Sequence, residues 1–98
     1  MSGLDPFRRR LDEIDADLLR LLGERFATCR EVAAYKHTHD VAMMQPGRVE
    51  QVRERYRAGG REHQLPADFA DALFELLIDA TCRMEDELMA AAAEAEAG

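Results

Sequence analysis

Two cations lie on an apolar helical face, where positive charge is costly. At 100° per residue, Arg25 and Lys36 stand about three turns apart along a helix and about 20° from each other around it. The apolar members of the same face are Phe7, Leu11, Ile14, Leu18, Leu21, Cys29 and Val32. A guanidinium or ammonium group in such surroundings needs an anion close by.

Two interpretations of these cations stay open. They could pair with an acidic residue of another helix, or extend their long side chains to the edge of the apolar face. Alternatively, they could bind an anionic ligand. A third cation, Arg48, follows on the next predicted helix and makes the ligand interpretation at least as good as the first.

A hydroxyl and a carboxyl group lie on one face of a third predicted helix. Phe74, Ile78, Thr81 and Glu85 follow the i, i+4, i+7, i+11 spacing of a helical face. Glu85 could simply form a salt bridge with Arg25 or Lys36. Alternatively, burial raises its pKa, so that the neutral carboxyl donates a hydrogen bond to a ligand.

Other catalytic chemistries have little support. The run from His37 to Asp40 holds two histidines but has no further His or Cys at ligand spacing, so we expect no metal. The sequence contains no catalytic triad pattern and no phosphate-binding glycine loop, and we expect no cofactor. Cys29 and Cys82 lie far apart, which is typical of reduced, buried thiols in a cytoplasmic protein.

The composition limits the size of the fold and its partners. The chain has 98 residues, with 13 Lys and Arg against 20 Asp and Glu, for a net charge of -7. This length predicts one domain, and the acidic balance argues against nucleic acid or an anionic membrane surface as a partner. No apolar run reaches the roughly 20 residues of a membrane-spanning helix. The N-terminus lacks the apolar core of a signal peptide, so we expect a cytoplasmic location.

The periodicity predicts an all-α chain of one long helix and two shorter ones. The long helix runs from an N-cap at Asp5 to about residue 38, the second from Pro46 to a stop at Gly59 and Gly60, and the third from residue 66 or 67. We expect one domain over residues 5–89 and a fraying, low-complexity tail over residues 90–98. The first helix would be about 50 Å long, whereas a compact chain of this size is roughly 33 Å across. Part of the helix would therefore extend beyond the rest of the chain, and a second copy of the chain is the simplest way to bury it.

The residues of the first helix resemble the type II, all-helical chorismate mutase family. The run from Arg8 through Leu11, Ile14, Asp15 and Leu18 to Glu24 and Arg25, followed by Val32, Ala33 and Lys36, carries the resemblance. It extends over most of the chain, from about Phe7 to Met89. The resemblance implies an intertwined homodimer of three-helix chains, in which the long first helices cross between subunits.

The resemblance also implies roles for individual residues. Arg25 would hold one carboxylate of a dicarboxylate substrate, and Arg8 would reach into the partner's site to bind the other. Lys36 and Glu85 would contact the ether oxygen of the breaking C–O bond. Arg48 and Thr81 match further substrate-binding positions of the family, which usually has serine in place of Thr81.

The second helix departs from the common chorismate mutase pattern. Gln45 and Val49 occupy positions at which chorismate mutases usually place acids near the C4 hydroxyl of the substrate. The stretch of residues 41–49, together with residues 82–86, is similar instead to 4-amino-4-deoxychorismate mutases. These enzymes supply 4-amino-4-deoxyprephenate for p-aminophenylalanine and derived antibiotics. Without the two acids, the amine at C4 would either bind neutral or meet backbone carbonyl oxygens.

The implied reaction is a sigmatropic (Claisen) rearrangement, which needs no nucleophile. It needs a substrate held in a reactive geometry and cationic donors at the ether oxygen. Chorismate mutase and isochorismate-pyruvate lyase activities are alternatives on the same fold. A helical dimerisation module without catalytic activity is a further alternative, for which Arg25→Met and Lys36→Met would stabilise the dimer.

Overall fold

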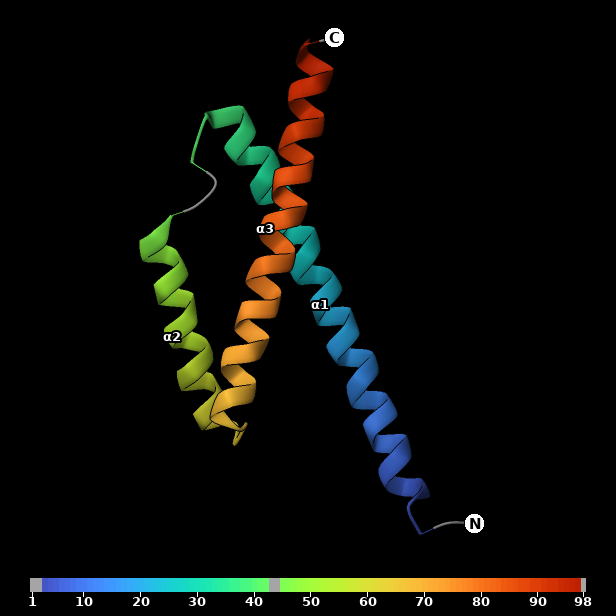
Figure 1. The fold of residues 1–98 in the computed structure, drawn as a ribbon. Coiled ribbons are helices and arrows are strands. Elements are labelled where there is room, and N and C mark those ends of the chain that lie inside the picture. Colours follow the sequence, from blue (N-terminus) through green and yellow to red (C-terminus); the bar gives the residue numbers. More distant parts are fainter. Residues whose placement is uncertain (1–2, 43–44, 98) are drawn as a thin grey trace.

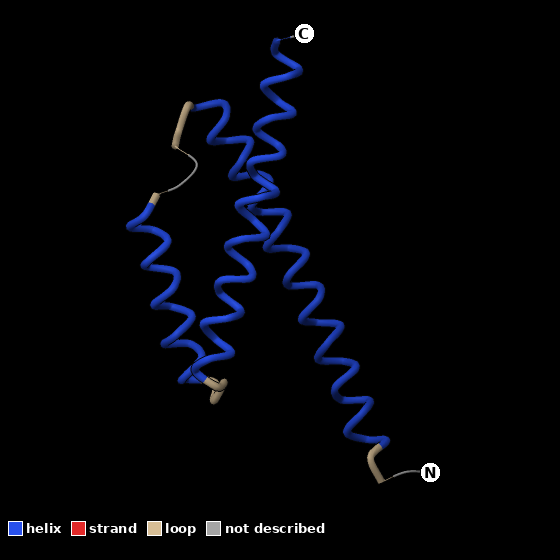
Figure 2. The backbone as a smooth tube through the Cα atoms, viewed as in Figure 1, coloured by secondary structure: helices blue, strands red, loops and turns tan. Residues whose placement is uncertain are grey.

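The computed structural model describes residues 3–42 and 45–97, which form three helices and no strand (Figure 1 and Figure 2). Helix α1 spans Asp5–His39, α2 spans Pro46–Glu62 and α3 spans Ala67–Ala97. The predicted all-α class and helix order are therefore confirmed. Met43 and Met44, which belong to the loop that carries part of the family resemblance, lie outside the described residues.

Helix α3 connects the other two helices. It packs against both α1 and α2, whereas the backbones of α1 and α2 stay more than 8 Å apart, Cα to Cα, in the described part of the chain. The small buried core consists of Ala33 on α1 and of Ala70, Phe74 and Leu77 on α3. Phe74 is fully buried, and its ring meets the Tyr56 ring of α2 edge to face at 5.5 Å.

The N-terminal half of α1 extends away from the other two helices (Figure 1). The radius of gyration is 17.7 Å, against about 13 Å for a compact chain of this length. The apolar face predicted from periodicity is present, but in the single chain its side chains lie open. Their exposed fractions run from 50% for Ile14 to 65% for Phe7, with Leu11, Leu18 and Leu21 between.

Two helix ends differ from the sequence prediction. Leu4 occupies the N-cap position of the first helix and makes no side-chain capping hydrogen bond. Asp5 is already in the first turn, where its negative charge interacts favourably with the helix dipole. Helix α2 passes through Gly59 and Gly60, neither of which has a positive φ. It ends in a Schellman motif, in which Gln64 takes the left-handed conformation and the Leu65 N–H donates to the Gly60 carbonyl oxygen at 2.8 Å.

The C-terminal tail also differs from the prediction, because α3 continues as a helix to Ala97. Alanine has the highest helix propensity, which favours this extension. Glu96 further contacts the end of α1, with its Oε1 2.6 Å from His37 Nε2. Helix α3, with 31 residues, is therefore almost as long as α1, with 35 residues, and the chain has two long helices rather than one.

Candidate active site

A cavity of about 200 Å³ opens between the three helices. Helix α1 contributes Arg25, Cys29 and Lys36, the segment around the start of α2 contributes Gln45, Arg48, Val49 and Val52, and α3 contributes Ile78, Thr81, Cys82 and Glu85. The structure thus brings together all of the site residues named from the sequence except Arg8. The lining combines three cations with a single acid, so it is positively charged even when that acid is ionised.

Lys36 and Glu85 face each other across the α1–α3 contact. Lys36 Nζ lies 3.9 Å from Glu85 Oε2, with side-chain exposures of 17% and 10%. Burial raises the pKa of Glu85, the Lys36 ammonium opposes this rise, and the neighbouring Asp86 carboxylate adds to it. The net result is a raised pKa, so both alternatives considered for Glu85, an ion pair with Lys36 and a raised pKa, are present together. The neutral carboxyl is available as a hydrogen-bond donor over a wider pH range than usual.

Arg25 carries an unused hydrogen-bond donor. Its Nη1 is buried and has no hydrogen-bond partner among the described residues. A buried guanidinium nitrogen without an acceptor is unfavourable in the empty protein. An anionic ligand in the cavity would supply the missing acceptor.

Thr81 is buried, and its hydroxyl already makes hydrogen bonds within α3. Its Oγ1 lies 2.8 Å from the Leu77 carbonyl oxygen and 3.2 Å from that of Ile78. Because a hydroxyl has one proton to donate, Thr81 offers a ligand only a hydrogen-bond acceptor while these bonds persist.

The α2 side of the cavity is more open. Arg48 and Gln45 are exposed and Val49 is half-buried. Arg48 Nη1 donates a hydrogen bond to Gln51 Oε1 at 2.6 Å, which holds its guanidinium near the helix surface. Val49 and Val52 make this wall partly apolar, and none of the described residues adds a carboxylate to it.

Both cysteines line the cavity and are unpaired, as predicted, but they are half-buried rather than buried. Burial raises the pKa of the Cys82 thiol, as do the charges of Glu85 and Asp86, so this thiol stays neutral near pH 7. Four further residues line the cavity, and their types alone did not indicate a site role: Cys29, Val52, Ile78 and Cys82. Helical spacing was the available signal, since Cys29 follows Arg25 by one turn and Ile78 and Cys82 precede Glu85 on α3.

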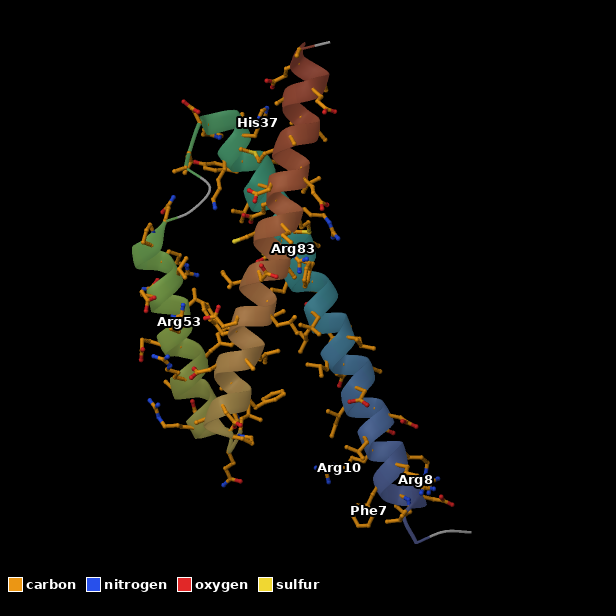
Figure 3. All side chains as sticks on the ribbon, in the orientation of Figure 1. Phe7, Arg8, Arg10, His37, Arg53 and Arg83 are labelled. Carbon is orange, nitrogen blue, oxygen red and sulfur yellow. The ribbon has the colours of Figure 1, made fainter. Side chains whose placement is uncertain are left out.

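Arg8 is not part of this cavity. It lies near the N-terminal end of α1 (Figure 3), is exposed, and its Nη1 is 3.9 Å from Asp5 Oδ1. Within the described residues, no group of three His, Cys, Asp or Glu side chains could hold a metal ion. The same part of the chain has no helix with the length and apolarity required to cross a membrane.

Comparisons with known proteins identify the family of the chain. The family model "Chorismate mutase type II" matches residues 7–86. The chain is 39% identical over 87 residues to a 4-amino-4-deoxychorismate mutase of Streptomyces pristinaespiralis, covering 89% of this chain and 67% of the relative. It is 37% identical over 86 residues to a 4-amino-4-deoxychorismate mutase of Streptomyces venezuelae, covering 88% of this chain and 84% of the relative.

A more distant relative comes from an archaeon. The chain is 29% identical over 76 residues to a chorismate mutase of Methanocaldococcus jannaschii, with 78% of this chain and 77% of the relative covered. No solved structure matches the chain significantly. The family model and the curated relatives together show that the chain belongs to the type II chorismate mutase family and is an isomerase of the chorismate mutase type.

Proposed function

We propose that this enzyme converts 4-amino-4-deoxychorismate to 4-amino-4-deoxyprephenate by a sigmatropic (Claisen) rearrangement, as a step toward p-aminophenylalanine and derived antibiotics. One C–O bond of the substrate breaks and one C–C bond forms, with no net exchange of protons or electrons with the protein. The names of the two Streptomyces relatives support this substrate.

The observation that carries the proposal is the arrangement of Arg25, Lys36 and Glu85 around one cavity. The unpartnered Nη1 of Arg25 is placed to bind a carboxylate. Lys36 Nζ and Glu85 Oε2, 3.9 Å apart on different helices, leave room for an oxygen atom to accept from both. Negative charge develops on the ether oxygen in the transition state, where such preorganised donors stabilise it most. The cations also hold the flexible dicarboxylate in its reactive geometry.

The working enzyme in this proposal is an intertwined homodimer. The exposed apolar face of α1 supports it, because a second α1 helix would remove that face from water. Arg8 would then enter the partner's cavity and bind the second carboxylate. The proposal includes a cytoplasmic location, which the unpaired Cys29 and Cys82 support.

A comparison of three substrates tests the proposed specificity. Purified protein is assayed with 4-amino-4-deoxychorismate, chorismate and isochorismate under the same conditions. We expect the highest kcat/KM with 4-amino-4-deoxychorismate. A higher kcat/KM with chorismate would favour the activity named for the archaeal relative, and turnover of none of the three would contradict a catalytic function.

A further inference from the structure

Helix α2 carries two sets of residues with different surroundings. Its first turns provide Arg48, Val49 and Val52 to the cavity, whereas the following turns contact α3. No Cα atom of α2 lies within 8 Å of one of α1 in the described part of the chain, so the packing of α2 in this chain is against α3. This packing therefore influences the distance between Arg48 and the Lys36–Glu85 pair.

Arg53 joins α2 to two residues of α3, Glu75 and Phe74. Its Nη1 donates a hydrogen bond to the carboxylate of Glu75 on α3, and its Nε donates to Glu50 Oε1 on its own helix at 3.3 Å. The guanidinium also lies 4.8 Å from the centre of the Phe74 ring, within cation–π range. Figure 3 shows Arg53 on the side of α2 that faces α3.

A second set of contacts lies one turn further along. Arg57 Nε donates to Asp71 Oδ1 on α3 at 2.9 Å. At Gly60, an added Cβ atom would come within 2.9 Å of Ala70 Cβ, so the two helices approach closely there. The helices are thus anchored at one end of their contact and separated by the cavity at the other.

Arg53 lies at the boundary between these two regions. Val49, one turn before it on α2, lines the cavity, and so does Ile78, one turn after Phe74 on α3. Loss of the Arg53 contacts would therefore release α2 next to Arg48, while Lys36 and Glu85 would keep their places on α1 and α3.

We propose that Arg53 is a positioning residue for substrate binding: through Glu75 and Phe74 it holds the first turns of α2 over the cavity, so that the Arg48 guanidinium meets the substrate. This inference rests on the proposed function, because it requires a substrate anion at Arg48. According to this inference, α2 contributes to substrate binding, whereas Lys36 and Glu85 contribute to the chemical step.

The test is steady-state kinetics with 4-amino-4-deoxychorismate on Arg53→Met, which keeps the length of the side chain but removes its charge. We expect KM to rise several-fold, because the first turns of α2 lose a contact that holds them against α3, and kcat and its pH profile to stay unchanged. Arg53→Lys should restore part of the lost affinity. Arg55→Met is the matched control, because Arg55 is an exposed arginine of the same helix, and its KM should equal that of the wild type.

A double-mutant cycle shows whether Arg53 acts through Arg48. In an Arg48→Met background, Arg53→Met should raise KM no further, because the two changes remove the same contact with the substrate.

Glu75→Gln, a milder change at an exposed position, should reproduce the rise in KM. It tests the same contact if the Arg53→Met protein does not fold. An unchanged KM in both Arg53→Met and Glu75→Gln, an independent effect in the Arg48→Met background, or an equal fall in kcat would overturn the inference. A wild-type protein inactive with all three substrates would instead contradict the proposed function, and this inference with it.

Discussion

At the scale of single residues, the chemistry of the cavity depends on the proton of Glu85. Burial raises its pKa, and only the protonated carboxyl can donate to the ether oxygen. We therefore expect kcat/KM to be highest below the raised pKa and to fall as the pH rises through it. Glu85→Gln, which always carries donor hydrogens, should flatten this profile. A pH-independent kcat/KM for the wild-type enzyme would exclude a role for the Glu85 proton.

Lys36 should be more important for the rate than any exposed cation. Removal of one preorganised donor at a developing charge typically lowers the rate about 100- to 1000-fold, or roughly 2.7–4 kcal/mol. Lys36→Ala should show at least this loss in kcat. Arg20→Ala is a suitable control, since Arg20 is exposed on the same helix and pairs with Asp17 and Glu24. Near-normal turnover by Lys36→Ala would remove Lys36 from the mechanism.

At the scale of the elements, the exposed apolar face of α1 should be a contact between subunits. Leu18 lies within this face, half exposed in the single chain. Leu18→Asp should shift the protein from dimer to monomer in sedimentation velocity, because it places a charge in the contact. Ala16→Asp introduces the same side chain on the opposite face of α1 and should leave the dimer intact. A monomeric wild-type protein would contradict this assembly.

The helices themselves could be predicted well from the sequence, and their ends less well. Apolar spacing places Arg25, Lys36, Thr81 and Glu85 on inward faces because every residue advances the helix by a fixed angle. The ends depend on backbone conformation, which residue type alone does not determine. Gly60 indicates a stop by its type, yet it lies inside α2, where its missing side chain allows the close approach of Ala70.

The distances across the cavity could not be predicted from the sequence. Helical periodicity shows which face of a helix a residue lies on. It does not show which residue of a neighbouring helix lies opposite. The 3.9 Å approach of Lys36 to Glu85 and the contact of Arg53 with Phe74 depend on how far α3 is displaced along α1 and α2. Cys29 and Ile78 were missed as cavity residues because apolar residues on an apolar face do not stand out.

At the scale of the whole molecule, the proposed site is shared between two chains. Arg8 is distant from the cavity of its own chain (Figure 3), so in the proposed homodimer it would act in the partner's cavity. Mixing of an Arg8→Ala protein with a Lys36→Ala protein, each nearly inactive alone, should create heterodimers with one intact site. Random pairing makes half of the dimers mixed, so we expect about one quarter of the wild-type activity. Failure to regain activity after confirmed subunit exchange would place Arg8 outside the site.

The most direct test of the central claim, an isomerisation in the cavity that contains Lys36 and Glu85, follows 4-amino-4-deoxychorismate by NMR during turnover. The wild-type enzyme should convert it to a product of the same mass, with a new C–C bond and no release of pyruvate. The Lys36→Ala protein should leave the substrate almost unchanged over the same time. Release of pyruvate, or equal conversion by the two proteins, would contradict the account.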